Sequence, residues 1–329
     1  MNANISKARI LVTGGAGFIG SNLCEFLVRN GAEVVCVDNL ITGHEENILA
    51  LFNNPLFEFH HLDIRDLDSL AEVMKGCTHV CHQAALGSVP RSIENPVHTN
   101  EHNITGSLNV FWAAHQAGIR RVVYASSSSV YGDEATLPKI EDRTGQLLSP
   151  YAVTKDVSES YATVFSNLYD MQMIGLRYFN VFGRRQDPDG AYAAVIPRFA
   201  KLLIEKKSPI IHGDGKQSRD FTHIDNVIQA NTKALFLDST NQMDEKINIA
   251  FGSRITINQL FNLLKLNLAE FDNEISGIEP VHSEDRPGDI KHSLADISNA
   301  RKVIGYNPKV DLESGLESYM KWFWEQHSS

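Results

Sequence analysis

The sequence predicts an α/β protein with a Rossmann-type, doubly wound parallel sheet and a smaller C-terminal α+β lobe. Three observations predict this fold class. Apolar runs of strand length alternate with helix-length amphipathic segments through the first half of the chain. A glycine-rich turn follows the first apolar run and opens a helix. After residue 180 the alternation stops, and glycine and proline become frequent.

The strands and helices follow from hydrophobic periodicity. Strands are expected at 9–12, 33–37, 57–61, 79–82, 121–125 and 173–178, and helices at 17–30, 68–75, 99–118 and 150–169. The last two helices carry apolar residues at helical spacing, namely Ile104, Leu108 and Phe111, then Val157, Tyr161, Val164 and Phe165. Such faces belong either to the core or to a dimer interface. A helix at 223–237 and a strand at 246–250 are expected to return to the sheet.

The bulk composition limits the classes of function. With 329 residues, 43% of them hydrophobic, the chain can form two lobes. A formal net charge of −10 argues against a nucleic-acid partner. No apolar run reaches the ~18 residues of a membrane span, and the polar residues 1–9 lead straight into a strand, so we expect a cytoplasmic protein without a membrane partner.

The four cysteines lie in apolar segments of the first quarter of the chain. Buried thiols are therefore favoured over disulfides. A zinc site of Cys77 and Cys81 with His79 and His82 is disfavoured, because the two cysteines lie across a turn and the start of a strand. We expect no metal.

The segment ILVTGGAGFIGSNL, which contains Gly14, Gly15, Gly17, Phe18, Ile19 and Gly20, predicts a dinucleotide site. Its glycines permit a tight turn and let backbone N–H groups approach a pyrophosphate at a helix N-terminus. Asp38, with Asn39 beside it, ends the next strand 18 residues after Gly20, where an acid binds the adenosine ribose and repels a 2′-phosphate. NAD is therefore favoured over NADP.

Further cofactor contacts are expected where the next strands end. Asp63 and Ile64 follow the third strand, at a natural place for an adenine contact. Gln83, Ala84 and Ala85 follow the fourth, where small residues let a cofactor lie close to the sheet. These assignments give residues 1–180, with 221–250, to an NAD-binding domain, and residues 181–220 and 251–329 to a second lobe.

Catalytic chemistry is predicted by YASSSSVYGD together with SPYAVTKDVSE. Tyr151 and Lys155 are four residues apart, which places both on one face of a helix. A nearby ammonium and a nicotinamide cation would favour the tyrosine phenolate and bring its pKa toward working pH. Tyr151 could then accept a proton from a hydroxyl as hydride leaves the carbon.

These motifs together carry a family resemblance. TGGAGFIG, SSSSVYG, Tyr151-x-x-x-Lys155 and LRYFNVFG resemble the extended short-chain dehydrogenase/reductase family over nearly the whole chain. GLRYFNVFGRRQDPDGAYAAVIPRF, GDGKQSRDFTHIDNV and RPGDIKHSLADIS resemble the bacterial UDP-N-acetylglucosamine 4-epimerases within it. The resemblance implies a homodimer, with 99–118 and 150–169 forming its interface, and a role in making cell-surface polysaccharide.

The resemblance also assigns roles to residues. It implies that Ser127 assists Tyr151 and that Lys155 binds the nicotinamide ribose, with Tyr178 also at the cofactor. Positions around the uridine and diphosphate are Asn180, Ala194, Val195, Arg219, Arg286 and Asp289. Positions lining the sugar pocket are Gly87, Ser88, Ser127, Ser128, Ser129, Gln186 and Ser293. Strand alternation makes Ser126 and Ser128 spacers and turns Ser127 and Ser129 toward the sugar. Ser293 leaves room for an N-acetyl group, where related epimerases of plain sugars carry tyrosine.

Four other functions would need residues or features that distinguish them from a 4-epimerase of plain or acetylated sugars. Nucleotide-sugar dehydratases and decarboxylases carry carboxylates where Ser127, Ser128 and Ser129 stand. A UDP-glucuronate or UDP-N-acetylglucosaminuronate 4-epimerase needs the same tyrosine and lysine, and it requires in addition a cation or extra donors near C6″. A non-catalytic NAD(H) sensor has no use for a base. A serine nucleophile would lack its Gly-x-Ser-x-Gly elbow.

Overall fold

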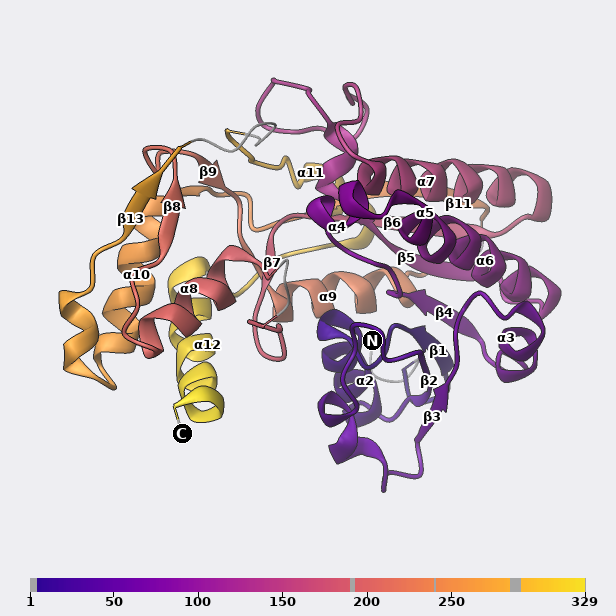
Figure 1. Cartoon of the computed structure of the whole chain (residues 1–329). Helices are drawn as coiled ribbons and strands as arrows, with labels where there is room; N and C mark the ends of the chain where they lie inside the picture. The colour runs from indigo at the N-terminus through magenta and orange to yellow at the C-terminus, as the bar shows by residue number, and fades with distance from the viewer. Residues whose placement is uncertain (1–4, 190–192, 240, 285–290, 329) are drawn as a thin grey trace.

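Seven parallel strands form one sheet in the computed structural model, which describes residues 5–189, 193–239, 241–284 and 291–328 (Figure 1). The sheet order is β11-β6-β5-β4-β1-β2-β3, so the strand order reverses between β1 and β4. The strands are β1 (Arg9–Thr13), β2 (Glu33–Asp38), β3 (Phe57–His61), β4 (His79–His82), β5 (Arg121–Ser127), β6 (Gln172–Tyr178) and β11 (Met243–Ile249). The predicted Rossmann-type fold class is confirmed.

Helices cover both faces of this sheet because successive strand residues point to opposite sides. In β1, Ile10 and Val12 join one core with α2 (Phe18–Arg29) and α9 (Ile224–Leu235), whereas Leu11 joins the other core. That second core is covered by α3 (Leu67–Val73), α6 (Gly106–Gln116) and α7 (Pro150–Tyr169). The four cysteines are free and buried, as expected.

The expected helix at 99–118 is interrupted. The chain forms α4 (Val89–Glu94) and α5 (Pro96–Asn100), then a π-helical turn, η3 (Glu101–Thr105), before α6. A π turn inserts one extra residue per turn and changes which side chains face inward. Here two consecutive polar residues, His102 and Asn103, are both buried.

The smaller lobe has three two-stranded sheets around a third core. The pairs are β7 (Val181–Phe182) with β10 (Thr222–His223), β8 (Ile210–His212) with β13 (Val281–Ser283), and β9 (Ser218–Arg219) with β12 (Ile255–Thr256). The helices of this lobe are α8 (Val195–Ile204), α10 (Ile257–Ala269) and α12 (Leu312–His327), with the short turn η5 (Asn273–Gly277). In the large lobe, the short turns are η1 (Glu45–Asn47), η2 (Leu49–Leu51) and η4 (Ser128–Tyr131). No helix in the described part of the chain is long and apolar enough to cross a membrane.

One segment of the smaller lobe returns to the large one. The backbone of Lys139 bridges to Ala295, and α11 (Ser298–Ile304) packs beside β11 and α9. Ala295, Ala300 and Ile304 accordingly belong to the first core of the sheet, although sequence reasoning assigned 251–329 to the second lobe.

Candidate active site

A cavity of about 390 Å³ lies at the carboxyl ends of β1, β2 and β4. Eleven of the predicted cofactor residues line it: Gly14, Gly17, Phe18, Ile19, Gly20, Asp38, Asn39, Ile64, Gln83, Ala84 and Ala85. Gly87, Gln186 and Ala194, predicted to face the substrate, line this cavity as well. The topological switch between β1 and β4 is the place where open α/β sheets bind ligands.

In the glycine-rich turn between β1 and α2, backbone segments approach one another so closely that side chains would not fit at two of the glycines. A Cβ on Gly20 would lie 2.0 Å from the carbonyl oxygen of Gly14, and one on Gly14 would lie 2.6 Å from the amide nitrogen of Ala84. Gly14 also has φ +66°, which favours glycine. Helix α2 starts at Phe18 without an acidic residue in its first turn, so its N-terminal N–H groups suit an anion.

Asp38 is held at the edge of the same cavity. Its Oδ2 accepts from the amide of Ala16 in the glycine turn at 2.9 Å, and its Oδ1 accepts from the amide of Leu40 at 2.8 Å. Both bonds fix the carboxylate where it faces the cavity. This placement suits a ribose diol, because a carboxylate still has lone pairs for two hydroxyl donors.

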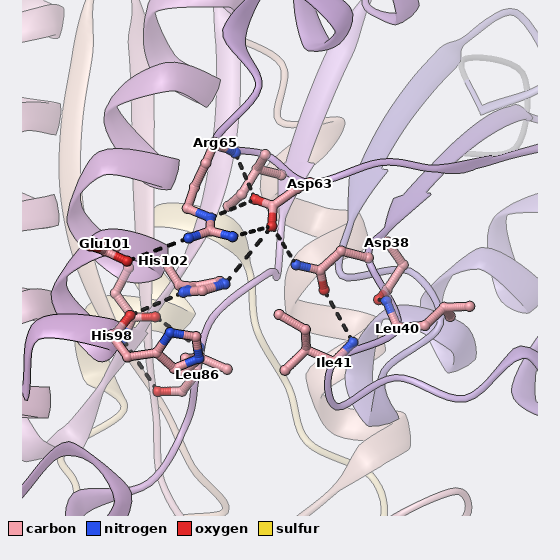
Figure 2. Close-up of polar contacts among 12 residues, drawn as sticks. Asp38, Leu40, Ile41, Asp63, Arg65, Leu86, His98, Glu101 and His102 are labelled. Atoms are coloured by element: carbon pink, nitrogen blue, oxygen red, sulfur yellow. Dashed lines mark hydrogen bonds and ion pairs between the residues drawn. The ribbon is translucent and has the colours of Figure 1, made fainter. Parts of the chain in front are cut away.

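Asp63 does not line the cavity, although Leu62 and Ile64 on either side of it do, and it is bound by neighbouring side chains (Figure 2). Its Oδ1 accepts from the amide of Arg65 at 2.9 Å and from Nε at 3.0 Å; its Oδ2 accepts from Nη2 of Arg65 at 2.8 Å and from Nδ2 of Asn39 at 2.9 Å. Burial raises the pKa of Asp63, but the bonds from Arg65 and Asn39 outweigh it and hold the pKa well below the usual range.

A second cavity, of about 220 Å³, gathers the predicted reacting groups. It is lined by Val89, Ser127, Ser128, Ser129, Tyr131, Lys139, Tyr151, Phe179 and Ser293. The prediction from strand alternation that Ser128 is a spacer was wrong, because β5 ends at Ser127 and the chain continues into the turn η4. Three consecutive hydroxyls therefore face the cavity, whereas Ser126 points away and donates to Glu159 at 2.5 Å.

Tyr151 and Lys155 are placed by the start of α7. Ser149 caps the helix by accepting from the amide of Ala152 at 3.1 Å, and Pro150 occupies the first turn. Tyr151 faces the cavity, and one turn later Lys155 is buried, with Nζ donating to the carbonyl of Ala125 at 2.8 Å and lying 5.9 Å from the Tyr151 ring.

The protein's own groups do not lower the pKa of Tyr151 as the sequence argument expected. Burial raises the pKa of Tyr151, and the hydrogen bond with Ser127 offsets only part of that rise. Burial also lowers the pKa of Lys155 to about 8, against the attraction of Glu159. The difference arises because burial penalises the charged forms of both groups.

A third cavity, of about 160 Å³, lies in the smaller lobe and shares Ala193 with the first. Asn180, Val195 and Arg219 line it, which brings together three residues predicted at the nucleotide of the substrate. Arg198, which sequence reasoning missed, lines it too. Two guanidinium groups at one cavity match the charge of a diphosphate.

Comparison with known proteins identifies the chain. The model of the NAD dependent epimerase/dehydratase family matches residues 10–250. The chain belongs to this family. It is similar to UDP-glucose 4-epimerase of Mycolicibacterium smegmatis, with 34% identity over 96% of this chain and 98% of that protein.

Two solved structures are similar over nearly the full length. UDP-N-acetylglucosamine 4-epimerase from Methanobrevibacter ruminantium M1, in complex with UDP-N-acetylmuramic acid, has 39% identity and a TM-score of 0.89 over 97% of this chain and 99% of that one. UDP-glucuronic acid 4-epimerase from Bacillus cereus, in complex with UDP-glucuronic acid and NAD, has 33% identity and a TM-score of 0.87, with the same coverage.

NAD, the cofactor of this family, fits the first cavity. The glycine turn leaves room for a pyrophosphate at α2, and Asp38 presents a carboxylate to a ribose. When bound, NAD⁺ supplies a hydride acceptor and a positive charge that favours the phenolate of Tyr151.

The remaining predicted residues are distributed as follows. Tyr178 lies behind the cofactor cavity, where its hydroxyl donates to Oε1 of Gln83 at 3.0 Å. Ser88 caps α4 by accepting from the amide of Arg91 at 3.2 Å. Arg286 and Asp289 lie outside the described residues.

Sequence reasoning also missed titratable residues that line these cavities, among them Lys139 in the second and His102 in the first. The available signal for His102 was a polar pair, His102 and Asn103, next to an apolar helical stripe. Lys139 gave no local signal, because it reaches the cavity from a loop more than ten residues before Tyr151.

Proposed function

We propose that the protein interconverts UDP-GlcNAc and UDP-GalNAc by inverting C4″. At the coarser level, the chain is an NAD-dependent nucleotide-sugar 4-epimerase. The observation that carries this proposal is the cavity that joins Ser127, Tyr151 and Ser293 at the end of β5. No aspartate or glutamate is among its described lining residues, so the protein offers no carboxylate pair for eliminating water.

In this proposal, Tyr151 accepts the proton of the 4″-hydroxyl as the C4″ hydride leaves, and it returns the proton when the hydride comes back to the opposite face. Ser127 shares a hydrogen bond with Tyr151 and holds its oxygen toward the sugar. Lys155, fixed by the Ala125 carbonyl, supplies positive charge behind Tyr151. The 4-keto sugar formed between the two transfers must rotate to present its opposite face, while the diphosphate stays bound. Holding the diphosphate is the role proposed for Arg219 and for Arg286.

Preference for the acetylated sugar is assigned to Ser293. Its amide donates to the carbonyl of Ser218 at 3.0 Å, which fixes this position of the chain at the cavity wall. A small side chain there leaves volume that an N-acetyl group can occupy. Exclusion by size, rather than attraction, would then sort the substrates.

The test is parallel incubation of the purified protein with UDP-GlcNAc, UDP-glucose and UDP-glucuronic acid without added NAD⁺, with C4″ epimers followed by NMR. We expect UDP-GlcNAc to react fastest and without accumulation of NADH, because the cofactor is regenerated in each cycle. A requirement for stoichiometric NAD⁺ would indicate a dehydrogenase, and binding without turnover would indicate a sensor.

One observation favours a second candidate, a 4-epimerase of uronic acid sugars. Lys139 lines the sugar cavity, is 5% exposed, and donates through Nζ to the backbone carbonyl of Glu134. Burial lowers the pKa of Lys139. A buried cation beside the sugar suits a C6″ carboxylate, so faster epimerisation of UDP-glucuronic acid in the same incubation would favour this candidate.

We also propose a homodimer and a cytoplasmic location. The dimer proposal is supported by exposed apolar side chains along α7, namely Val153, Val164 and Leu168, and by Ile93 and Val97 on the neighbouring α4 and α5. Phe165, on the other side of α7, is buried in the core.

A further inference from the structure

Lys155 is a buried cation whose hydrogen-bond partner carries no net charge. Its side chain belongs to a residue that is 4% exposed, and its Nζ donates to the backbone carbonyl of Ala125 at 2.8 Å. Removing an ammonium group from water is costly unless an opposite charge lies nearby. The proton on Lys155 therefore depends on the charges that surround it.

Glu159 is the acidic residue on the same face of α7. It lies one helical turn beyond Lys155, is 5% exposed, and attracts the ammonium group, against the effect of burial. Other titratable groups face these two residues from α7, from the sheet and from η4. They are Tyr151 of α7, His82 of β4, Tyr124 of β5, Arg177 of β6, Asp244 of β11 and Tyr131 of η4.

None of these other groups brings an unpaired negative charge to Lys155. Burial raises the pKa of all three tyrosines and lowers the pKa of His82 to about 3, so these four side chains are neutral at neutral pH. Asp244 is paired with Lys246 on the same strand. The charge that can stabilise the ammonium group of Lys155 is therefore that of Glu159.

The carboxylate of Glu159 is fixed by two neighbouring strands. Oε1 accepts from Nε of Arg177 at 2.9 Å and from the hydroxyl of Ser126 at 2.5 Å, and Oε2 accepts from Nη2 of Arg177 at 2.7 Å. Ser126 is the serine of the SSSS run that points away from the second cavity. Its bond gives this serine a place in the site, behind Lys155 and not beside the sugar.

We propose that Glu159 is a positioning residue for epimerisation, which holds a negative charge where it keeps Lys155 protonated beside Tyr151. In this role, which rests on the function proposed above for Tyr151 and Lys155, Glu159 acts through the lysine. It lines neither the cofactor cavity nor the second cavity. Lys155 transmits the effect, because an ammonium group favours the phenolate of Tyr151.

The expected effect on the pH profile has a definite sign. Burial lowers the pKa of Lys155 to about 8, with the attraction of Glu159 opposing it. In Glu159→Gln that attraction is gone and the pKa falls further, so Lys155 loses its proton, and the protein its activity, at lower pH. The alkaline limb of the kcat profile should therefore move down by about one pH unit.

The measurement is kcat across neutral and alkaline pH, with saturating amounts of the UDP-sugar that the wild type epimerises fastest. Glu159→Asp keeps the charge and should keep the wild-type limb, even where turnover falls. Asp156→Asn is the matched control, because it removes the neighbouring carboxylate of the same helix, and it should leave the limb unchanged. A purely structural role of Glu159 would lower kcat equally at every pH.

A second variant covers loss of folding. Glu159→Gln leaves Arg177 buried without its partner, so Glu159→Gln is also combined with Arg177→Met, which removes both charges of the pair. We expect the alkaline limb of this combined variant to lie below that of wild type as well. A limb at the wild-type pH in the combined variant, or an equal shift in Glu159→Asp, would overturn the proposal. Full activity of Tyr151→Phe would instead contradict the proposed base, so the two failures are distinguishable.

Discussion

At the scale of single residues, the second cavity combines three serine hydroxyl groups with Tyr151, and Lys155 is buried one helical turn further along α7. Burial raises the pKa of Tyr151, so the neutral phenol is favoured until a further cation is placed nearby, whereas Lys155, with its pKa lowered to about 8, stays mostly protonated at neutral pH. This arrangement ties proton acceptance by Tyr151 to the presence of the oxidised cofactor. Such coupling suits the proposed reaction, in which a proton leaves the hydroxyl oxygen as the hydride leaves the carbon that bears it.

Ser293 allows a direct prediction about substrate size. Ser293→Tyr should reduce turnover of UDP-GlcNAc at least ~10-fold more than turnover of UDP-glucose, because the larger side chain fills the volume assigned to the N-acetyl group. The measurement is kcat/KM for both sugars. Ser293→Ala adds no bulk and should keep the wild-type order. Equal losses for the two sugars in Ser293→Tyr would contradict the role of this position.

The reacting groups could be predicted from local spacing in the sequence. Residues whose positions depend on long-range contacts could not be predicted in this way. Tyr151 and Lys155 are one helical turn apart, and the serines are consecutive at the end of one strand, so each of these two patterns is visible in the sequence. Lys139 and His102 reach their cavities from a loop and from a π turn, and Asp63 is bonded to Arg65 and does not line the cofactor cavity. None of these three placements follows from the periodicity of one segment.

At the scale of elements, α7 carries the chemistry on one face. Tyr151, Lys155 and Glu159 follow at intervals of four residues. Glu159 accepts from Nε of Arg177 at 2.9 Å and from Nη2 at 2.7 Å, and this buried ion pair ties the helix to β6. The same carboxylate binds Ser126 on β5, so one residue fixes the distance between the helix and the serine-bearing strand.

The glycine turn before α2 provides a prediction about an element. In Gly20→Ala the new methyl group would lie 2.0 Å from the carbonyl oxygen of Gly14, so the turn must open. We expect a loss of about 1–3 kcal/mol in the free energy of unfolding, together with loss of bound NAD. Thermal unfolding and the nucleotide content of the purified protein measure the two effects. The matched control is Gly277→Ala in η5, where an added Cβ meets nothing within 4 Å. Normal stability and NAD content in Gly20→Ala would contradict this account of the turn.

At the scale of the whole molecule, alternation of apolar runs predicted the sheet, because both faces of a parallel sheet are covered and its strands are continuously apolar. The smaller lobe was predicted only as a break in that rhythm. Its strands β7, β9, β10 and β12 have two residues each, too few to show a period. The return of α11 to the large lobe depends on packing against β11 and α9, which no local pattern encodes.

The proposed dimer is the prediction that concerns the whole molecule. Leu168 on α7 is 69% exposed, and Val164 one turn earlier is 46% exposed, which leaves apolar area uncovered in the single chain. Replacing both with glutamate should convert the dimer to a monomer, because two charges would be buried against apolar partners without compensation. Light scattering coupled to gel filtration measures the mass. Leu266→Glu on α10 is the control, since Leu266 is 65% exposed in the other lobe and its replacement should leave the mass unchanged. Bound NAD should persist in the monomer, because the described lining residues of the cofactor cavity include none from α7. A wild type that is monomeric at micromolar concentration would refute the interface.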